Sequence, residues 1–149
     1  MKTAIVYYSA HHGNTRKLAE AVARGRDVIL MDVQEVKSAD LSGYDLIGFA
    51  SGIYFGKFHR SVVEFAKNNL PQGKKVFFLA TYGGSNGTKA IEEAVRERDA
   101  QIVGSFGCKG YDTFGPFRLV GGICKGHPDE TDLKNARRFL DGLMKTAEN

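Results

Sequence analysis

Two hydrophobic patterns alternate along this chain: short continuous apolar runs, and longer segments with a single apolar stripe. The first run, from Ala4 to Ser9, is rich in β-branched and aromatic residues and predicts a fully buried strand. Behind Thr15 the pattern changes to a helical stripe flanked by charged residues. The apolar positions of this stripe are Leu18, Ala19, Val22 and Ala23. The segment therefore predicts a helix with one buried face.

The same succession continues to the end of the chain. Further strands are expected at residues 27–33, 44–51, 75–80 and 101–106, with helices at 59–69, after Thr88 as a cap, and from about Asp129. Asp132 stands three residues after Asp129, a variant of the capping box. Residues 34–43 predict an irregular crossover, and the glycine-rich residues 107–128 a long loop. Strands alternating with helices predict one α/β domain over residues 1–149, with a parallel sheet covered on both faces.

In a parallel sheet of this kind, ligands lie beyond the carboxyl ends of the strands. Three loops at such ends are rich in glycine, hydroxyl and aromatic side chains: residues 9–15, 52–58 and 81–87. The first loop joins a strand to a helix N-terminus, where backbone N–H groups attract an anion such as phosphate. The three loops are therefore expected to converge on one phosphate-bearing ligand.

Length and charge narrow the class of protein. A chain of 149 residues can bury a full core as one domain, and it has no apolar run near the roughly 18 residues of a membrane span. The first strand follows Met1 too closely for a signal peptide, which predicts a cytoplasmic protein. The net charge is +4 with a pI of about 9.1, but the basic residues are scattered in short pairs. This pattern favours an acidic partner or an anionic ligand over nucleic acid.

The cysteines and histidines give no sign of a metal site. Cys108 and Cys124 form no CxxC motif, so they are expected to be buried or unreactive thiols, although a disulfide stays open. No two of the four histidines stand four residues apart, which argues against zinc.

Several known phosphate-binding motifs are absent. The chain has no GxGxxG for a dinucleotide, and the segment from Gly83 to Lys89 does not match a GxxxxGK[ST] loop. The third predicted strand ends at Ser51, whereas a response-regulator receiver needs an aspartate there. A cradle of hydroxyls and backbone N–H groups remains.

The strand Ile5 to Ser9, the Gly13-Asn14-Thr15 turn and Ala19 resemble the flavodoxin family, and the resemblance extends over nearly the whole chain. It implies a three-layer sandwich with a five-stranded parallel sheet in the order 2-1-3-4-5, and FMN as cofactor. The implied FMN-binding residues are Ser9, His11, His12, Gly13, Asn14 and Thr15 around the phosphate, Ser51, Gly52, Ile53, Tyr54, Phe55, Gly56 and Lys57 on one side of the ring, and Thr81, Tyr82, Gly83 and Gly84 on the other.

Each of these assignments has a plainer alternative. One of His11 and His12 can simply be a solvent-exposed loop residue, and at least one aromatic residue of the second loop is expected in the core. Tyr111 and Phe114, in the long loop, are further candidates for contact with the ring.

Two features depart from the family pattern. The His11-His12 pair places Gly13 one residue farther from Ser9 than the usual family loop does. The net charge of +4 contrasts with the strongly acidic surface of familiar flavodoxins, which predicts redox partners with acidic docking surfaces.

The resemblance implies an electron carrier that shuttles single electrons through semiquinone and hydroquinone FMN, with Gly56 as the residue whose peptide turns toward the flavin N5. The alternative is an enzyme, an FMN-dependent NAD(P)H:quinone-type oxidoreductase, for which a wide loop at residues 107–126 would provide a substrate pocket. A sensory or oxidase-type domain is a third, weaker alternative.

Overall fold

The computed structural model describes residues 1–10, 13–84, 87–110 and 124–148. In chain order, the described residues form β1 (Thr3–Tyr8), α1 (Asn14–Ala23), β2 (Val28–Asp32), β3 (Leu46–Tyr54), β4 (Lys57–Phe58), α2 (Arg60–Asn69), β5 (Lys75–Tyr82), α3 (Lys89–Arg96), β6 (Gln101–Lys109) and α4 (Glu130–Glu148). The alternation of strands and helices predicted from the hydrophobic pattern is confirmed.

The main strands pair in parallel in the order β2-β1-β3-β5-β6, and the two-residue β4 pairs antiparallel with the end of β3. The order 2-1-3-4-5 implied by the family resemblance is therefore correct for the five long strands. The chain adds β2 beside one edge of β1, and then adds β3, β5 and β6 in the opposite direction. The strand order therefore switches between β1 and β3. In open α/β sheets, ligands bind at the carboxyl ends of the strands where the strand order switches, which is this junction.

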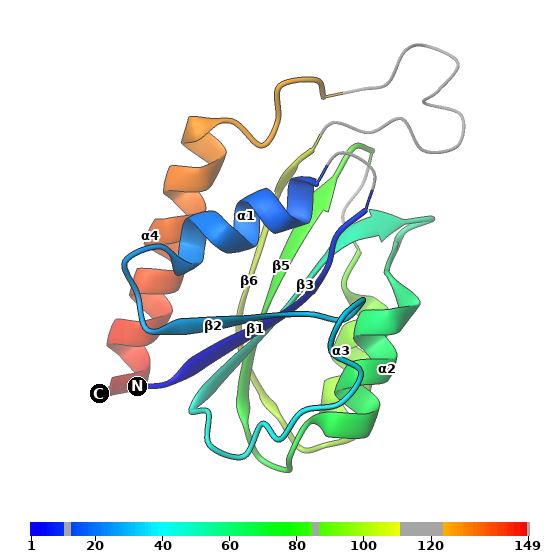
Figure 1. Ribbon diagram of the computed structural model, residues 1–149, viewed down its shortest axis with the longest axis vertical. Helices are drawn as coiled ribbons and strands as arrows, with labels where there is room; N and C mark the ends of the chain where they lie inside the picture. Colours follow the sequence, from blue (N-terminus) through cyan, green and yellow to red (C-terminus); the bar gives the residue numbers. More distant parts are fainter. Residues whose placement is uncertain (11–12, 85–86, 111–123, 149) are drawn as a thin grey trace.

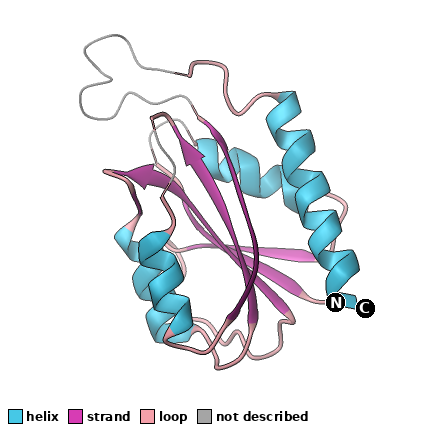
Figure 2. Cartoon of the chain, turned by 180° about the vertical axis from the view of Figure 1, so that it is seen from behind, coloured by secondary structure: helices cyan, strands magenta, loops and turns pink. Residues whose placement is uncertain are grey.

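Two helices cover each face of the sheet. α1 and α4 pack together on one face, and α2 and α3 on the other (Figures 1 and 2). Each helix turns its apolar stripe inward, which produces two cores separated by the sheet. The fully buried helix residues are Leu18, Ala19, Val22, Ala136 and Leu140 on the first face, and Val62, Ala66, Ile91 and Val95 on the second.

Close packing between sheet and side chains depends on one glycine of β3. A Cβ atom at Gly48 would lie 2.3 Å from the ring of Phe77, which is itself fully buried on the neighbouring strand β5. The missing side chain makes room for the large ring, as expected where a sheet glycine faces a bulky neighbour.

The ends of several elements differ from the predictions. Strands β5 and β6 continue to Tyr82 and Lys109, and β3 to Tyr54, because each extra residue finds a backbone partner on an adjacent strand. The irregular crossover at residues 34–43 and the capping box of α4 are confirmed: the backbone N–H of Asp132 donates to Asp129 Oδ1 at 2.9 Å, and that of Asp129 to Asp132 Oδ2 at 2.9 Å. Among the described residues, no helix combines the length and apolar character needed to cross a membrane.

Candidate cofactor site

The three predicted ligand loops meet at the carboxyl edge of the sheet. The parallel register places Tyr8 beside Ser51, Gly52 beside Thr81, and Tyr82 beside Lys109. The ends of β1, β3, β5 and β6 thus form one continuous border, at the junction where the strand order switches. The expected convergence of the loops is confirmed for their described residues.

The first loop enters α1 through a left-handed residue without a side chain. Gly13 is the N-cap with φ 69°, and the first turn of the helix contains no acidic residue. The hydroxyl of Ser9 accepts a hydrogen bond from the backbone N–H of Arg16 at 3.1 Å, which draws the end of β1 toward the helix N-terminus. A helix N-terminus of this kind favours an anion. Two of the six predicted phosphate residues, His11 and His12, lie outside the described residues.

Thr15 connects the first loop with the third. Its Oγ1 lies 3.0 Å from Oγ1 of Thr81 in a buried hydrogen bond, and both side chains are almost fully buried. Asn14 contacts the end of β6: a Cβ atom on Gly110 would lie 2.7 Å from Asn14 Nδ2. The backbone N–H of Gly110 donates to the carbonyl of Tyr82 at 2.9 Å.

The second loop is a β-hairpin, so the prediction of a loop without regular structure over residues 52–58 is wrong. Tyr54 pairs with Lys57, and the two residues between them have φ 51° at Phe55 and 78° at Gly56. Two positive φ angles in succession are the requirement of a type I′ turn, whose twist matches that of the strands. Phe58 is buried and packs edge-on against Phe78, which confirms that one aromatic of this segment belongs to the core.

The base of the hairpin rests on an aromatic cluster that the sequence reasoning missed. The ring of His59 is stacked on Tyr8, with centroids 3.6 Å apart, and Tyr54 meets both rings edge-on. His59 also caps α2, because its Nδ1 accepts the backbone N–H of Ser61 at 3.1 Å. Burial lowers the pKa of His59, which keeps the ring neutral and Nδ1 free to accept.

Ser51 is directed inward. It is fully buried, its hydroxyl donates to the carbonyl of Gly52 at 2.6 Å, and its oxygen accepts the backbone N–H of His59 at 2.9 Å. These bonds tie the end of β3 to the start of α2. The side chain therefore positions the hairpin, while Gly52, Ile53 and Tyr54 are half-buried on the border itself.

The third loop contacts the hairpin through two glycines. A Cβ atom at Gly87 would lie 2.1 Å from the carbonyl oxygen of Gly56, so the backbones of the two segments touch. Thr81 is buried, Tyr82 and Gly83 are half-buried, and Gly84 is exposed. The hairpin and the third loop are in contact before any ligand is considered.

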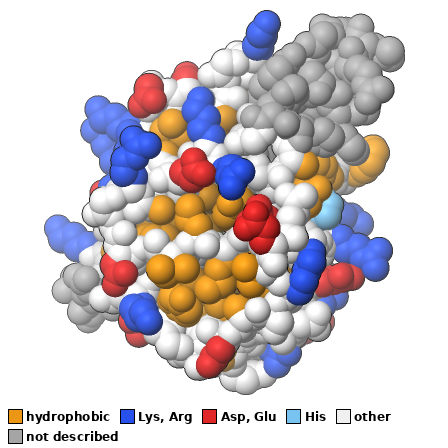
Figure 3. All heavy atoms as spheres, viewed as in Figure 1, with side chains coloured by type: hydrophobic (Ala, Val, Ile, Leu, Met, Phe, Trp, Pro, Cys, Tyr) orange, Lys and Arg blue, Asp and Glu red, His pale blue; other side chains and the backbone are white. Residues whose placement is uncertain are grey.

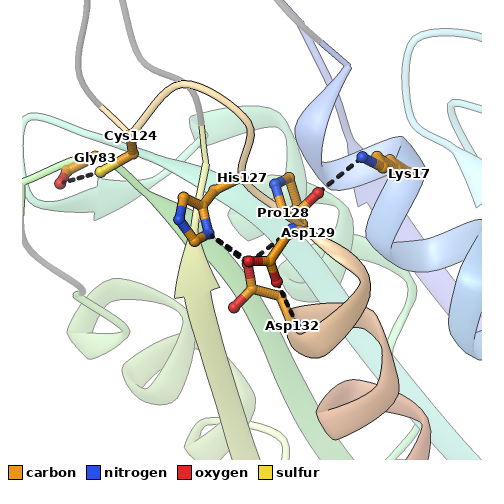
Figure 4. A network of polar contacts seen from close by, with 7 residues as sticks. All are labelled: Lys17, Gly83, Cys124, His127, Pro128, Asp129 and Asp132. Atoms are coloured by element: carbon orange, nitrogen blue, oxygen red, sulfur yellow. Dashed lines mark hydrogen bonds and ion pairs between the residues drawn. The ribbon is translucent and has the colours of Figure 1, made fainter.

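A polar network anchors the residues that lead into α4 (Figure 4). Lys17 Nζ of α1 donates to the carbonyl of Pro128 at 2.7 Å, and His127 Nδ1 lies 2.7 Å from Asp132 Oδ2. The thiol of Cys124 lies 3.5 Å from the carbonyl of Gly83, which it faces as donor. Burial would raise the pKa of Asp132, but the hydrogen bonds from His127 and Asp129 together lower it. The segment is thereby tied both to α1 and to the third loop.

Three potential metal ligands occur in that network, but their geometry has a simpler role. The ligand atoms of His127, Asp129 and Asp132 lie within 4.8 Å of one another. Both carboxylates already accept hydrogen bonds in the capping box, and Asp132 also binds His127. The cluster is accounted for as the cap of α4.

Cys108 and Cys124 are both free thiols, with no disulfide between them. Cys108 is buried on β6, and burial, with the nearby charges of Asp132 and Asp129, raises its pKa to about 12. A thiol with such a pKa is not a nucleophile at neutral pH. The expectation of a buried cysteine is confirmed for Cys108.

The donors at this edge fit a phosphorylated planar ligand. The N-terminus of α1 provides backbone N–H groups for a phosphate, while the hairpin and the third loop provide two half-buried aromatic residues, Tyr54 and Tyr82. Tyr111 and Phe114 lie outside the described residues. The geometry was predictable as far as the loops' convergence, whereas Gly87, Gly110 and His59 had no recognisable signal in the sequence.

Comparison with known proteins gives consistent matches. A family model described as a flavodoxin domain matches residues 5–110. An uncharacterized protein of Methanocaldococcus jannaschii is 39% identical, over 97% of this chain and 99% of that protein. Among solved structures, a flavodoxin from the domain Archaea has a TM-score of 0.68 at 21% identity, covering 99% of both chains. A Fusobacterium nucleatum flavodoxin bound to flavin mononucleotide has a TM-score of 0.68 at 13% identity, covering 98% of this chain and 99% of the other.

Proposed function

This chain belongs to the flavodoxin family, and from that premise we propose that it binds FMN and carries single electrons between redox proteins that dock through acidic surfaces. The observation that carries the proposal is the meeting of three loops at the switch in strand order, around the N-terminus of α1 with its left-handed Gly13. The flavin, when bound, supplies the electron chemistry, and the protein supplies binding and orientation.

Residues of the first loop would hold the phosphate. The backbone N–H groups of Asn14 and Thr15 belong to the first turn of α1, and the hydroxyl of Ser9 lies beside that turn. The N–H of Gly13 donates to the carbonyl of Ala10 at 3.3 Å, which shapes the loop ahead of the helix. Hydroxyls and main-chain donors are sufficient for a phosphate dianion. The proposal also includes His11 and His12 as phosphate neighbours.

Residues of the hairpin and the third loop would flank the ring. In the proposal, Ile53 to Lys57 line one side and Thr81 to Gly84 the other. Support comes from their position on the same border and from the contact between Gly56 and Gly87, which fixes one segment against the other.

The free thiols Cys108 and Cys124 fit a reducing compartment, and the proposal places the protein in the cytoplasm. The enzymatic alternative depended on a pocket at residues 107–126, most of which lie outside the described residues. We propose the carrier, and direct reduction by NADH or NADPH is the outcome that would favour the oxidoreductase instead.

A comparison of FMN with riboflavin tests the proposal. We expect the purified protein to show the absorption bands of bound flavin, and the apoprotein to bind FMN at least about tenfold more tightly than riboflavin, since only FMN reaches the N-terminus of α1 with a phosphate. Equal affinity for the two ligands would refute the phosphate assignment. Rapid anaerobic bleaching by NADH or NADPH alone would instead favour the oxidoreductase.

A further inference from the structure

Four segments that border the candidate cofactor site each carry an exposed lysine. We call Lys57, Lys89, Lys109 and Lys125 the basic rim; all four side chains are exposed. They come from four different segments: β4, the start of α3, the end of β6 and the segment before α4.

Contacts at the site place these segments next to one another. Lys57 directly follows Gly56, whose carbonyl touches Gly87, and Lys89 stands two residues beyond Gly87. Lys109 pairs with Tyr82 at the end of the sheet.

The fourth lysine is placed by the third loop. Lys125 follows Cys124, whose thiol contacts the carbonyl of Gly83. Each lysine of the rim is therefore within two residues of a contact made by the hairpin or the third loop.

The charge of the rim is not neutralised locally. Within the described parts of the chain, none of the four lysines forms an ion pair with a carboxylate. Nearby acids are already engaged: Glu64 pairs with Arg60 at 2.8 Å, and Asp132 with His127 at 2.7 Å. By contrast, acidic and basic side chains alternate on the face shown in Figure 3. The four rim lysines therefore have no carboxylate partner among the described residues.

An exposed aromatic residue adjoins the rim. Phe55 is 82% exposed at the tip of the hairpin, beside Lys57, with a positive φ of 51°. A left-handed conformation is unfavourable for a bulky residue, and such strain concentrates at functional positions. An aromatic centre with a charged surround is the usual composition of a protein-binding surface.

We infer that the basic rim and Phe55 form the docking surface for an acidic protein, whose carboxylates would face Lys57, Lys89, Lys109 and Lys125. Charge complementarity favours this occupant, and the position of the rim around the three loops would bring the partner to the cofactor edge. The electron-transfer purpose rests on the proposed function, but the binding itself needs no cofactor. Such attraction acts mainly on the association rate and weakens with salt.

Charge-reversal variants with a matched control test this inference. The triple variant K89E/K109E/K125E alters three lysines of the rim that are not among the predicted FMN residues. The control K2E/K67E/K145E makes the same change in net charge at the other end of the molecule, where β1 begins and α2 and α4 end. A decaglutamate peptide is titrated into each ¹⁵N-labelled protein at low salt and followed by NMR.

We expect peptide-induced shifts at the rim and the hairpin, and a loss of affinity of about tenfold or more in the rim variant, with the control variant close to the parent. Equal losses in both variants would show that only net charge matters and would overturn the inference. Tighter binding of a ten-residue oligothymidylate at the same amides would overturn it in favour of nucleic acid.

Flavin spectra recorded on the same samples separate this inference from the proposed function. Peptide binding at the rim without any bound or bindable FMN would leave the docking surface standing and remove the electron carrier. FMN binding without peptide binding would remove the docking surface alone.

Discussion

Replacement of Gly87 by alanine tests whether contact between the loops holds the cofactor site together. The added Cβ would lie 2.1 Å from the carbonyl oxygen of Gly56, and a real side chain almost never approaches another atom closer than 3.0 Å. The obstacle is backbone in a hairpin whose tip already has two positive φ angles, so it cannot turn aside as a side chain would. The third loop and the hairpin must separate.

The expected cost of Gly87→Ala has two parts. Overpacking of this kind typically costs about 1–3 kcal/mol, which urea unfolding of the apoprotein would detect. The displaced hairpin would also weaken FMN binding by about tenfold or more, measured by quenching of FMN fluorescence. Gly43→Ala is the matched control, since a Cβ at Gly43 has nothing within 4 Å. If Gly87→Ala binds FMN as tightly as the parent and unfolds at the same urea concentration, the contact has no role in the site.

Three further substitutions probe separate features. A Cβ at Gly56 meets no atom within 4 Å, but the residue has φ 78°, so Gly56→Ala raises the energy of the present turn by about 1 kcal/mol. We expect a narrower gap between the two one-electron reduction potentials of bound FMN. Unchanged potentials would refute the role of this peptide. Burial lowers the pKa of His59, so the folded state resists protonation, and the free energy of unfolding falls as the pH drops through 6.5. The variant His59→Asn removes this titration but keeps a side-chain acceptor for the backbone N–H of Ser61. Its urea midpoint should therefore fall less than the parent's between pH 7 and pH 5. Gly142 is exposed inside α4 with nothing near its Cβ position, so Gly142→Ala should stabilise the protein by about 0.5–1 kcal/mol, and a lower urea midpoint would contradict this.

The hydrophobic pattern was enough to predict most elements and a parallel sheet covered on both faces, because each buried element carries its own period, whereas the strand order was implied by the family resemblance. The stripe at Leu18 and Val22 and the run before Ser9 indicate a helix and a strand that pack on the same core, and both are found there. The capping box of Asp129 and Asp132 was equally local, since both partners stand within one turn.

The hairpin was missed because its turn lacks the usual residues. A type I′ turn is normally recognised by Asn-Gly or Asp-Gly, whereas here Phe55 occupies the first left-handed position. The strand pairing of Tyr54 and Lys57 depends on that turn. Because of one unusual turn residue, the turn, the extension of β3 and the short strand β4 were all missed. The stack of His59 on Tyr8 was hidden for another reason: 51 positions separate the two residues in sequence, and only the sheet brings them together.

The contacts at the carboxyl edge explain why these loops act as a unit. Thr15 binds Thr81, Asn14 adjoins Gly110, and Gly87 touches Gly56, so every predicted ligand loop has a direct contact with another segment of the border. Two of these contacts require a glycine whose Cβ would collide with its neighbour. A side chain at Gly87 or Gly110 would therefore displace the neighbouring segment that the glycine contacts. The shape of the site thus depends on contacts between loops, not on each loop alone. The rim lysines stand within two residues of contacts made by the hairpin or the third loop, so the same contacts position their backbones. The same contacts between loops thus shape the ligand site and position the segments that carry the rim lysines. A substitution that separates these segments should weaken ligand binding and partner binding together.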